Sequence, residues 1–224
     1  MLLVRDSMTR EVVTVAPGAT AAEALALCRE RRIRHLPVVE GGRLVGLISD
    51  RDLRSATPAL GDPDRTAALE RITVGDEMAR EVVMAHPDDP IEHAAMAMYE
   101  KRIGCLPVVG GDELVGILTA SDVMKAFVRL VGAHEPGSRV EVALPDRPGA
   151  LAGVVDVLRE AGVNLVSVLA SSEAERGSDG AARRVVVLRL GTVNTLGVVE
   201  RLRGAGYGVL WPPAPDDEGS GRAS

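Results

Sequence analysis

Two stretches of the chain decide its fold: HLPVVEGGRLVGLISDRDL at residues 35–53 and CLPVVGGDELVGILTASDV at residues 105–123. They lie 70 residues apart. The same shift aligns residues 4–52 with residues 74–122 without a gap, and 21 of those 49 positions are identical. Self-similarity at a fixed spacing marks a duplicated structural unit. The N-terminal part of the chain is therefore predicted to contain two copies of one small unit.

The two copies share one predicted order of elements. In copy one we expect a strand over 10–17, a helix over 20–31, a hairpin over 35–49 and a second helix after Ser49. The hairpin is expected to turn at Gly41–Gly42 in copy one and at Gly110–Gly111 in copy two. Each copy is thus β-α-β-β-α. Pairing two such copies would bury a continuous core and leave clefts between them.

These strings, with the openings VRDSMTREVVTVAP (4–17) and VGDEMAREVVMAHP (74–87), closely resemble the CBS motif. The resemblance implies a pseudo-two-fold pair of motifs, the Bateman module, with a regulatory role. It also implies an adenosine-type ligand in the clefts, namely AMP, ADP, ATP or S-adenosylmethionine. No required cofactor is implied.

The resemblance places the ribose of that ligand on a Ser or Thr followed three residues later by Asp. These positions are Ser49 and Asp52 in copy one, and Thr119 and Asp122 in copy two. A carboxylate can accept hydrogen bonds from both ribose hydroxyls. The same spacing is also that of a capping box at the start of a helix. Both interpretations stay open, and one residue can serve both roles.

The copies differ where phosphate-binding CBS motifs place basic side chains. Copy one has Arg34, His35 and Arg51, and copy two has Gly104, Cys105 and Ser121 at the same positions. We therefore expect copy one to hold the phosphate-binding cleft. Copy two would take a less anionic adenosyl ligand or stay empty. The alternative is that Arg34 belongs with Arg29, Arg31 and Arg32 to a solvated helix end. The remaining candidates are Val13 and Val83, which could pack on adenine or belong to the core, together with Pro37, Asp50 and Pro107.

A second pattern begins after Gly137. Strands are predicted over 139–144, 163–169, 184–190 and 207–211, with helices over 150–161 and 195–203. The order βαββαβ is that of a ferredoxin-like domain, so the whole chain is predicted to be α+β. The string DRPGALAGVVDVLREAGVNL (146–165) resembles the signature of ACT domains. The predicted division is CBS motif 1 at 1–57, linker 58–70, CBS motif 2 at 71–130, linker 131–138, ACT domain 139–212 and a disordered tail at 213–224.

ACT domains commonly bind amino acids or other small metabolites. Gly149 would let a ligand approach the backbone, and the following helix N-terminus would attract a carboxylate. The resemblance implies an effector site formed by Asp146, Pro148, Gly149, Ala150, Leu151 and Asn164. The alternative is structural: Asp146 caps the helix, Pro148 starts it, and the domain serves only as a dimer scaffold.

Composition and motifs exclude several classes of function. A net charge of −6 without a Lys/Arg block disfavours nucleic-acid binding. We find no run long enough to span a membrane. The two distant cysteines, Cys28 and Cys105, indicate free thiols in a reducing compartment, so we expect a cytoplasmic protein. The four scattered histidines have no metal-ligand spacing, and no catalytic motif occurs.

A CBS pair followed by an ACT domain resembles, in architecture, the acetoin-utilisation CBS/ACT proteins. We therefore expect a non-catalytic homodimer that changes the activity of a partner enzyme when a small-molecule effector binds. One alternative is a ligand-free dimerisation adaptor. Another is an enzyme acting on nucleotides, which the absence of catalytic residues disfavours.

Overall fold

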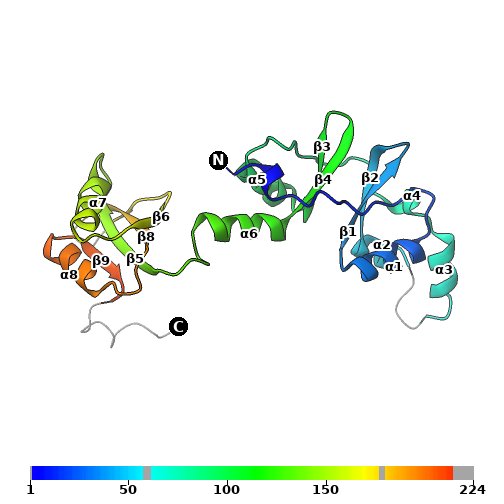
Figure 1. Ribbon diagram of the computed structural model, residues 1–224. Helices are drawn as coiled ribbons and strands as arrows, with labels where there is room; N and C mark the ends of the chain where they lie inside the picture. The colour runs from blue at the N-terminus through cyan, green and yellow to red at the C-terminus, as the bar shows by residue number, and fades with distance from the viewer. Residues whose placement is uncertain (1, 58–61, 177–179, 214–224) are drawn as a thin grey trace. The chain divides into compact units, whose positions relative to one another are not determined.

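The computed structural model describes residues 2–57, 62–176 and 180–213. It has two compact units, residues 1–126 and residues 127–224 (Figure 1). The architecture is mixed α+β, as predicted. The joining residues 58–61 and most of the tail predicted to be disordered (214–224) lie outside the described residues.

The first unit contains both copies of the repeat. Copy one comprises the 3-10 turn η1 (Val4–Asp6), α1 (Ala21–Arg31), β1 (His35–Glu40), β2 (Arg43–Ser49) and α2 (Asp50–Ser55). After α3 (Arg65–Arg71), copy two comprises α4 (Val74–Glu77), α5 (Ile91–Lys101), β3 (Cys105–Gly110), β4 (Glu113–Thr119) and α6 (Ala120–Leu130). The predicted helices and hairpins are present in both copies.

The strand predicted over 10–17 is wrong, because the structure has only a single parallel bridge there, between Val15 and Val38. Val15 donates to the carbonyl of Pro37 and accepts from Val39. Extending this ladder would need an N–H from Pro17 on one side and from Pro37 on the other. Proline has no N–H to donate. Copy two repeats the arrangement around Ala85, so the prolines limit the strand in both copies.

The hairpin turns differ by one residue from the prediction in copy two. Gly41 and Gly42 have φ of +57° and +82°, which suits a tight hairpin turn. In copy two, Gly110 still pairs with Glu113 as the last residue of β3. The turn is therefore Gly111–Asp112, not Gly110–Gly111.

The opening segment of each copy packs on the other copy. Val4 lies in the core of copy two with Leu106 and Leu118, while Val74 lies in the core of copy one. Backbone hydrogen bonds hold the exchange, including one of 2.9 Å from the N–H of Thr9 to the carbonyl of Ile117. Neither copy completes its core alone, so the pair forms one folding unit.

The exchange depends on two equivalent glycines in β2 and β4. A Cβ on Gly46 would overlap Sδ of Met78, and a Cβ on Gly116 would overlap Sδ of Met8. Each methionine belongs to the opening segment of the opposite copy. The two copies are therefore joined by the same close approach, made twice.

The second unit is a sheet with two helices on one face. Its elements are β5 (Ser138–Pro145), α7 (Ala150–Glu160), β6 (Leu165–Ala170), β7 (Glu175–Arg176), β8 (Ala182–Leu190), α8 (Leu196–Gly204) and β9 (Gly208–Trp211). The strand order β6-β8-β5-β9, with β7 paired to β8, contains the predicted βαββαβ plan. β7 is an addition, since no strand was predicted between residues 169 and 184.

The segment predicted as a linker after α6 is bound to this sheet. The carbonyl of Val131 accepts a 2.9 Å hydrogen bond from Oγ of Ser167. Arg189 donates to the carbonyl of Glu135 at 2.6 Å. Gly132 lies between these two contacts, just after the end of α6, and its φ of +65° suits the end of a helix. These contacts order the backbone that leads from α6 into β5.

Candidate functional site

The predicted ribose-binding pairs form capping boxes with matching geometry. In copy one, Oγ of Ser49 donates to Oδ2 of Asp52 at 2.6 Å, and the Ser49 N–H donates to the same oxygen at 3.0 Å. Thr119 and Asp122 repeat both distances. The capping interpretation is confirmed. In both aspartates Oδ1 accepts no hydrogen bond from a described residue, so it remains available to a ligand hydroxyl.

In copy one, the predicted residues meet at the open end of the hairpin. His35 pairs directly with Ser49 across β1 and β2. The carbonyl of Arg34 accepts a 2.9 Å hydrogen bond from the N–H of Asp50, the first residue of α2. The segment containing Val13 runs alongside, held through the carbonyl of Pro37. The start of β1, the segment containing Val13 and the start of α2 therefore lie close together.

Copy two has the same convergence. Cys105 pairs with Thr119, and the carbonyl of Gly104 accepts a 3.0 Å hydrogen bond from the N–H of Ala120. The carbonyl of Pro107 accepts from Ala85, just beyond Val83. The two candidate sites thus share one backbone frame.

The apolar walls of the two sites differ in exposure. Val13 packs against the core of copy one, whereas Val83 is 36% exposed. Pro37 and Pro107 are buried. Val83 therefore offers a more open apolar surface to an adenine ring than the partly buried Val13 does.

At the equivalent positions, basic side chains occur only at the copy-one site. Arg34 and Arg51 are exposed, while Asp50 is held by Arg54 at 2.9 Å. At the copy-two site Ser121 is exposed, and Cys105 is 1% exposed. Burial raises the pKa of the Cys105 thiol to about 12, so it is not a reactive thiolate.

His35 has a contact that was not predicted. Its ring lies against copy two, where a Cβ on Gly104 would be 3.2 Å from Cε1. Burial and Arg34 hold the pKa of His35 below its ordinary value, although Asp50 and Asp52 oppose the shift. The repeat alignment carried the signal: the position equivalent to Arg34 is a glycine, which leaves room for the ring.

In the second unit, the predicted Asp146 has a structural partner. Its Oδ1 accepts hydrogen bonds from Nε and Nη2 of Arg184, both 3.1 Å long. Arg184 also donates to the carbonyls of Ser171 and Ser172, at 2.6 and 2.8 Å. The proposed cap by Asp146 is wrong, because the N-cap of α7 is Gly149, with φ of +79° and no side-chain cap.

The other predicted effector residues surround the start of α7 and the turn before β6. Pro148 and Asn164 are exposed, and the Asn164 carbonyl accepts a 2.8 Å hydrogen bond from Gly191. Ala150 and Leu151 are half-buried against the core. Their side chains offer little polar contact to an effector.

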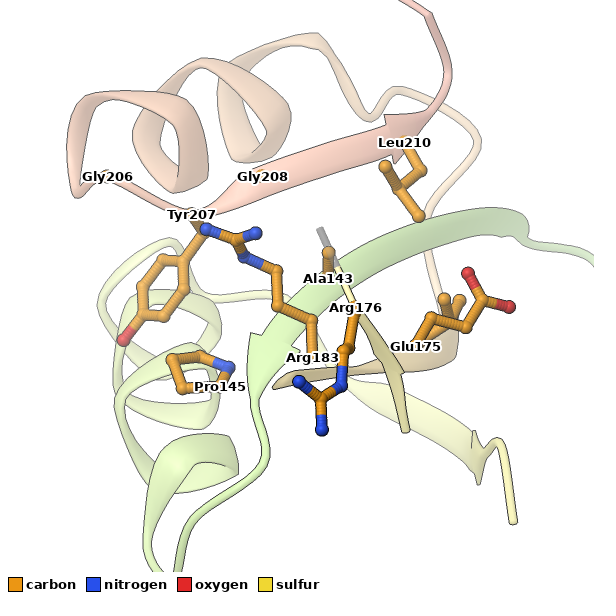
Figure 2. Close-up of a pocket in the computed structure, with 10 residues that line it drawn as sticks. Ala143, Pro145, Glu175, Arg176, Arg183, Gly206, Tyr207, Gly208 and Leu210 are labelled. Atoms are coloured by element: carbon orange, nitrogen blue, oxygen red, sulfur yellow. The ribbon is translucent and has the colours of Figure 1, made fainter. Parts of the chain in front are cut away.

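A pocket of about 570 Å³ lies elsewhere on this unit, on the sheet face away from the helices (Figure 2). The placement follows from the register: Ala143 pairs with Val185, while their neighbours Val142 and Val186 are buried toward the helices. None of the six predicted effector residues lines it. Its lining residues are Ala143, Pro145, Glu175, Arg176, Arg183, Val185, Gly206, Tyr207, Gly208 and Leu210.

Neither a metal site nor a membrane-spanning helix is found in the part of the chain that the structure describes. Residues 2–57, 62–176 and 180–213 hold no cluster of three or more His, Cys, Asp or Glu side chains able to bind a metal ion. Within the same ranges, every helix is too short or too polar to cross a membrane.

Comparison with known families decides the identity of both units. The CBS domain model matches residues 4–58 and 74–129, and the ACT domain model matches residues 138–206. The chain is a CBS-domain protein with a C-terminal ACT domain. The resemblance predicted from the two repeats and from residues 146–165 is therefore confirmed.

Three solved structures are similar to the CBS-domain protein. AcuB from Vibrio cholerae, assigned to acetoin utilization, is 33% identical with a TM-score of 0.52, over 60% of this chain and 96% of that one. The CBS pair of MJ0100, in complex with 5′-methylthioadenosine and S-adenosylmethionine, is 30% identical with a TM-score of 0.50, over 60% and 98%. CBSX2 from Arabidopsis thaliana, in complex with AMP, is 28% identical with a TM-score of 0.51, over 58% and 99%.

Proposed function

We propose that this protein is a non-catalytic cytoplasmic regulator whose CBS pair binds an adenosine-type ligand. The observation that carries the proposal is the pair of aspartates, Asp52 and Asp122. Each presents an unused carboxylate oxygen beside a hydroxyl group, at the point where a hairpin, an extended segment and a helix start converge. Two similar CBS pairs, in complex with AMP or S-adenosylmethionine, support the choice of ligand class.

The two clefts are proposed to differ in ligand. Exposed Arg34 and Arg51, together with His35, whose ring lies beside Gly104, favour a phosphate at the copy-one site. The copy-two site offers the exposed Val83 and no basic side chain at the equivalent positions, which favours an adenosyl group of lower negative charge. Ligand binding would then shift the packing of the pair and so the activity of a partner.

A melting experiment tests ligand binding at both sites. AMP, ATP and S-adenosylmethionine are added separately to wild type, Asp52→Asn and Asp122→Asn. Asp76→Asn is the matched control, because Thr73 and Asp76 form a capping box with the same 2.6 and 3.0 Å distances at the start of α4. We expect the ligands to raise the melting temperature of the wild type. Each cleft variant should lose the part of this rise that comes from its own site, and the control should keep the whole rise. No stabilisation of the wild type by any of the three ligands would leave a ligand-free adaptor as the better account.

The pathway and the ACT ligand are further parts of the proposal. Similarity to AcuB supports a role in regulating acetoin or acetate metabolism through a partner enzyme. For the ACT domain we propose a small carboxylate effector, an amino acid for example. Melting with a panel of amino acids tests this, and Asn164→Ala against Arg176→Ala separates the predicted α7 site from the pocket on the opposite sheet face.

A further inference from the structure

The pocket on the sheet face away from the helices owes its shape to two small residues. Ala143 of β5 pairs with Gly208 of β9 on one side and with Val185 of β8 on the other. A Cβ on Gly208 would lie 3.7 Å from Cβ of Ala143, an ordinary contact, and the φ of Gly208 is outside the left-handed region. The backbone therefore does not require glycine here. Glycine in a strand often marks a place that a ligand approaches closely.

The pocket combines an apolar floor with a few charged side chains. Ala143, Val185 and Leu210 form the floor, and Leu210 is 49% exposed although it is a large apolar residue. Arg176 and Arg183 add two guanidinium groups. Apolar surface with a small number of polar groups is the usual lining of a small-molecule site.

The charges in the pocket leave an excess of one positive charge. Its two arginines, Arg176 and Arg183, outnumber its single acid, Glu175. Figure 2 shows both guanidinium groups pointing away from the carboxylate of Glu175. Arg176 is exposed, and its guanidinium makes no ion pair with any residue that the structure describes. Because a guanidinium can hold a carboxylate through two parallel hydrogen bonds, the pocket suits a ligand with one negative charge.

Glu175 limits what the rest of the ligand can be. In the register of β7 and β8 it lies directly opposite Arg183. A ligand with a second carboxylate would bring that group toward the like charge of Glu175, and like charges placed together disfavour binding. The pocket therefore favours a monocarboxylate over a dicarboxylate of the same length.

We propose that this pocket binds a monocarboxylate with an apolar body. The carboxylate lies on Arg176 and Arg183, and the hydrocarbon group packs on Ala143, Val185 and Leu210. This site is on the face of the sheet opposite to α7, where the effector residues were predicted. The proposal rests on the effector role proposed for the ACT domain, and it is independent of the nucleotide sites.

Three probes of equal length test the ligand class on the full chain: hexanoate, hexan-1-ol and adipate. Binding is followed by amide NMR shifts of the ¹⁵N-labelled protein. Hexanoate should shift the signals of Gly206 and Gly208, which line the pocket. Hexan-1-ol, which has no carboxylate, and adipate, which has two, should each bind roughly tenfold more weakly. Glu175→Gln should reduce the difference between hexanoate and adipate.

Variants locate the site. Arg176→Ala should raise the dissociation constant of hexanoate by roughly tenfold, the scale of one hydrogen bond to a charged group. Gly208→Leu should abolish binding, because the new side chain would fill the space beside Ala143. Asn164→Ala, at the predicted α7 site, should leave the dissociation constant unchanged. Arg176 and Asn164 are exposed, so both variants should keep the melting temperature of the wild type.

Three results would overturn the proposal. One is an Arg176→Ala protein that binds hexanoate as the wild type does. Another is equal affinity of the wild type for hexanoate and hexan-1-ol, or no binding of hexanoate at all. The third is loss of binding in Asn164→Ala with retention in Gly208→Leu, which would move the ligand to the start of α7 and leave the effector role of the ACT domain standing.

Discussion

The two copies of the CBS motif have nearly the same backbone but different side chains at their candidate sites. Arg32 and Arg102 end α1 and α5 with φ of +54° and +55°, a conformation that is uncommon outside glycine. Each copy also has a capping box at its site and a methionine of the other copy against its hairpin glycine. Where the backbone agrees this closely, a difference such as His35 against Cys105 is not imposed by the backbone.

The largest expected effect tests the close approach of a methionine to a hairpin glycine, which both copies share. Gly46→Ala and Gly116→Ala should each lower the free energy of unfolding by about 1–3 kcal/mol, because the new Cβ would force Met78 or Met8 to move. Urea denaturation measures the loss. Gly18→Ala, which has no atom within 4 Å of the new Cβ, is the control. A large loss in one copy and none in the other would break the symmetry on which the comparison rests.

The next effect separates the two sites by charge. Arg34→Ala and Arg51→Ala should each weaken AMP binding by roughly tenfold, which is the scale of one hydrogen bond to a charged group. Neither change should affect S-adenosylmethionine. Conversely, Ser121→Arg should strengthen AMP binding at the copy-two site. Calorimetric titration gives the affinities, and equal loss for both ligands would argue against a phosphate role for these arginines.

A smaller effect concerns pH and His35. Burial lowers the pKa of His35 in the folded state, so the unfolded chain takes up the proton first as the pH falls. The stability that neutral His35 contributes is present above its ordinary pKa of about 6.5 and is lost as the pH falls through the folded value. Denaturation at pH 7.5 and 5.5 should show a smaller difference for His35→Gln than for wild type. His93→Gln, on an exposed histidine of α5, should behave like wild type.

The smallest effect concerns the residue that replaces His35 in copy two. With a pKa of about 12, the Cys105 thiol should react with a disulfide reagent only on unfolding. A His35→Cys thiol, at a half-buried position, should react faster in the native protein. Absorbance of the released thiolate measures both rates. Fast labelling of Cys105 in the native state would mean that the copy-two site is more open than described.

Much of this fold was predictable because the repeat shows the same hydrophobic pattern and the same turn residues twice. The hairpins, the helices and the ACT plan follow from hydrophobic periodicity and turn residues. The strand over 10–17 was mispredicted because one of its two limits comes from Pro37, a residue of another strand. The exchange of opening segments was also hidden, since aligned copies look the same whichever core Val4 and Val74 enter.

At the candidate sites, pairs of residues close in sequence were predicted, whereas contacts between distant segments were not. The resemblance to CBS motifs pointed to the Ser49–Asp52 and Thr119–Asp122 pairs, their spacing predicted capping boxes, and the caps are confirmed. The contact of His35 with Gly104 joins residues of different copies, and the partnership of Asp146 with Arg184 joins β8 to the loop before α7. Such pairs depend on the packing of distant segments, which periodicity does not report.

The inequality of the two clefts is tested most directly by calorimetric titration of AMP into wild type, Asp52→Asn and Asp122→Asn. The predicted result is one tight AMP site in the wild type, lost in Asp52→Asn and retained in Asp122→Asn. Loss of that site in Asp122→Asn with retention in Asp52→Asn would contradict the account, since phosphate binding would then belong to the copy without the arginines.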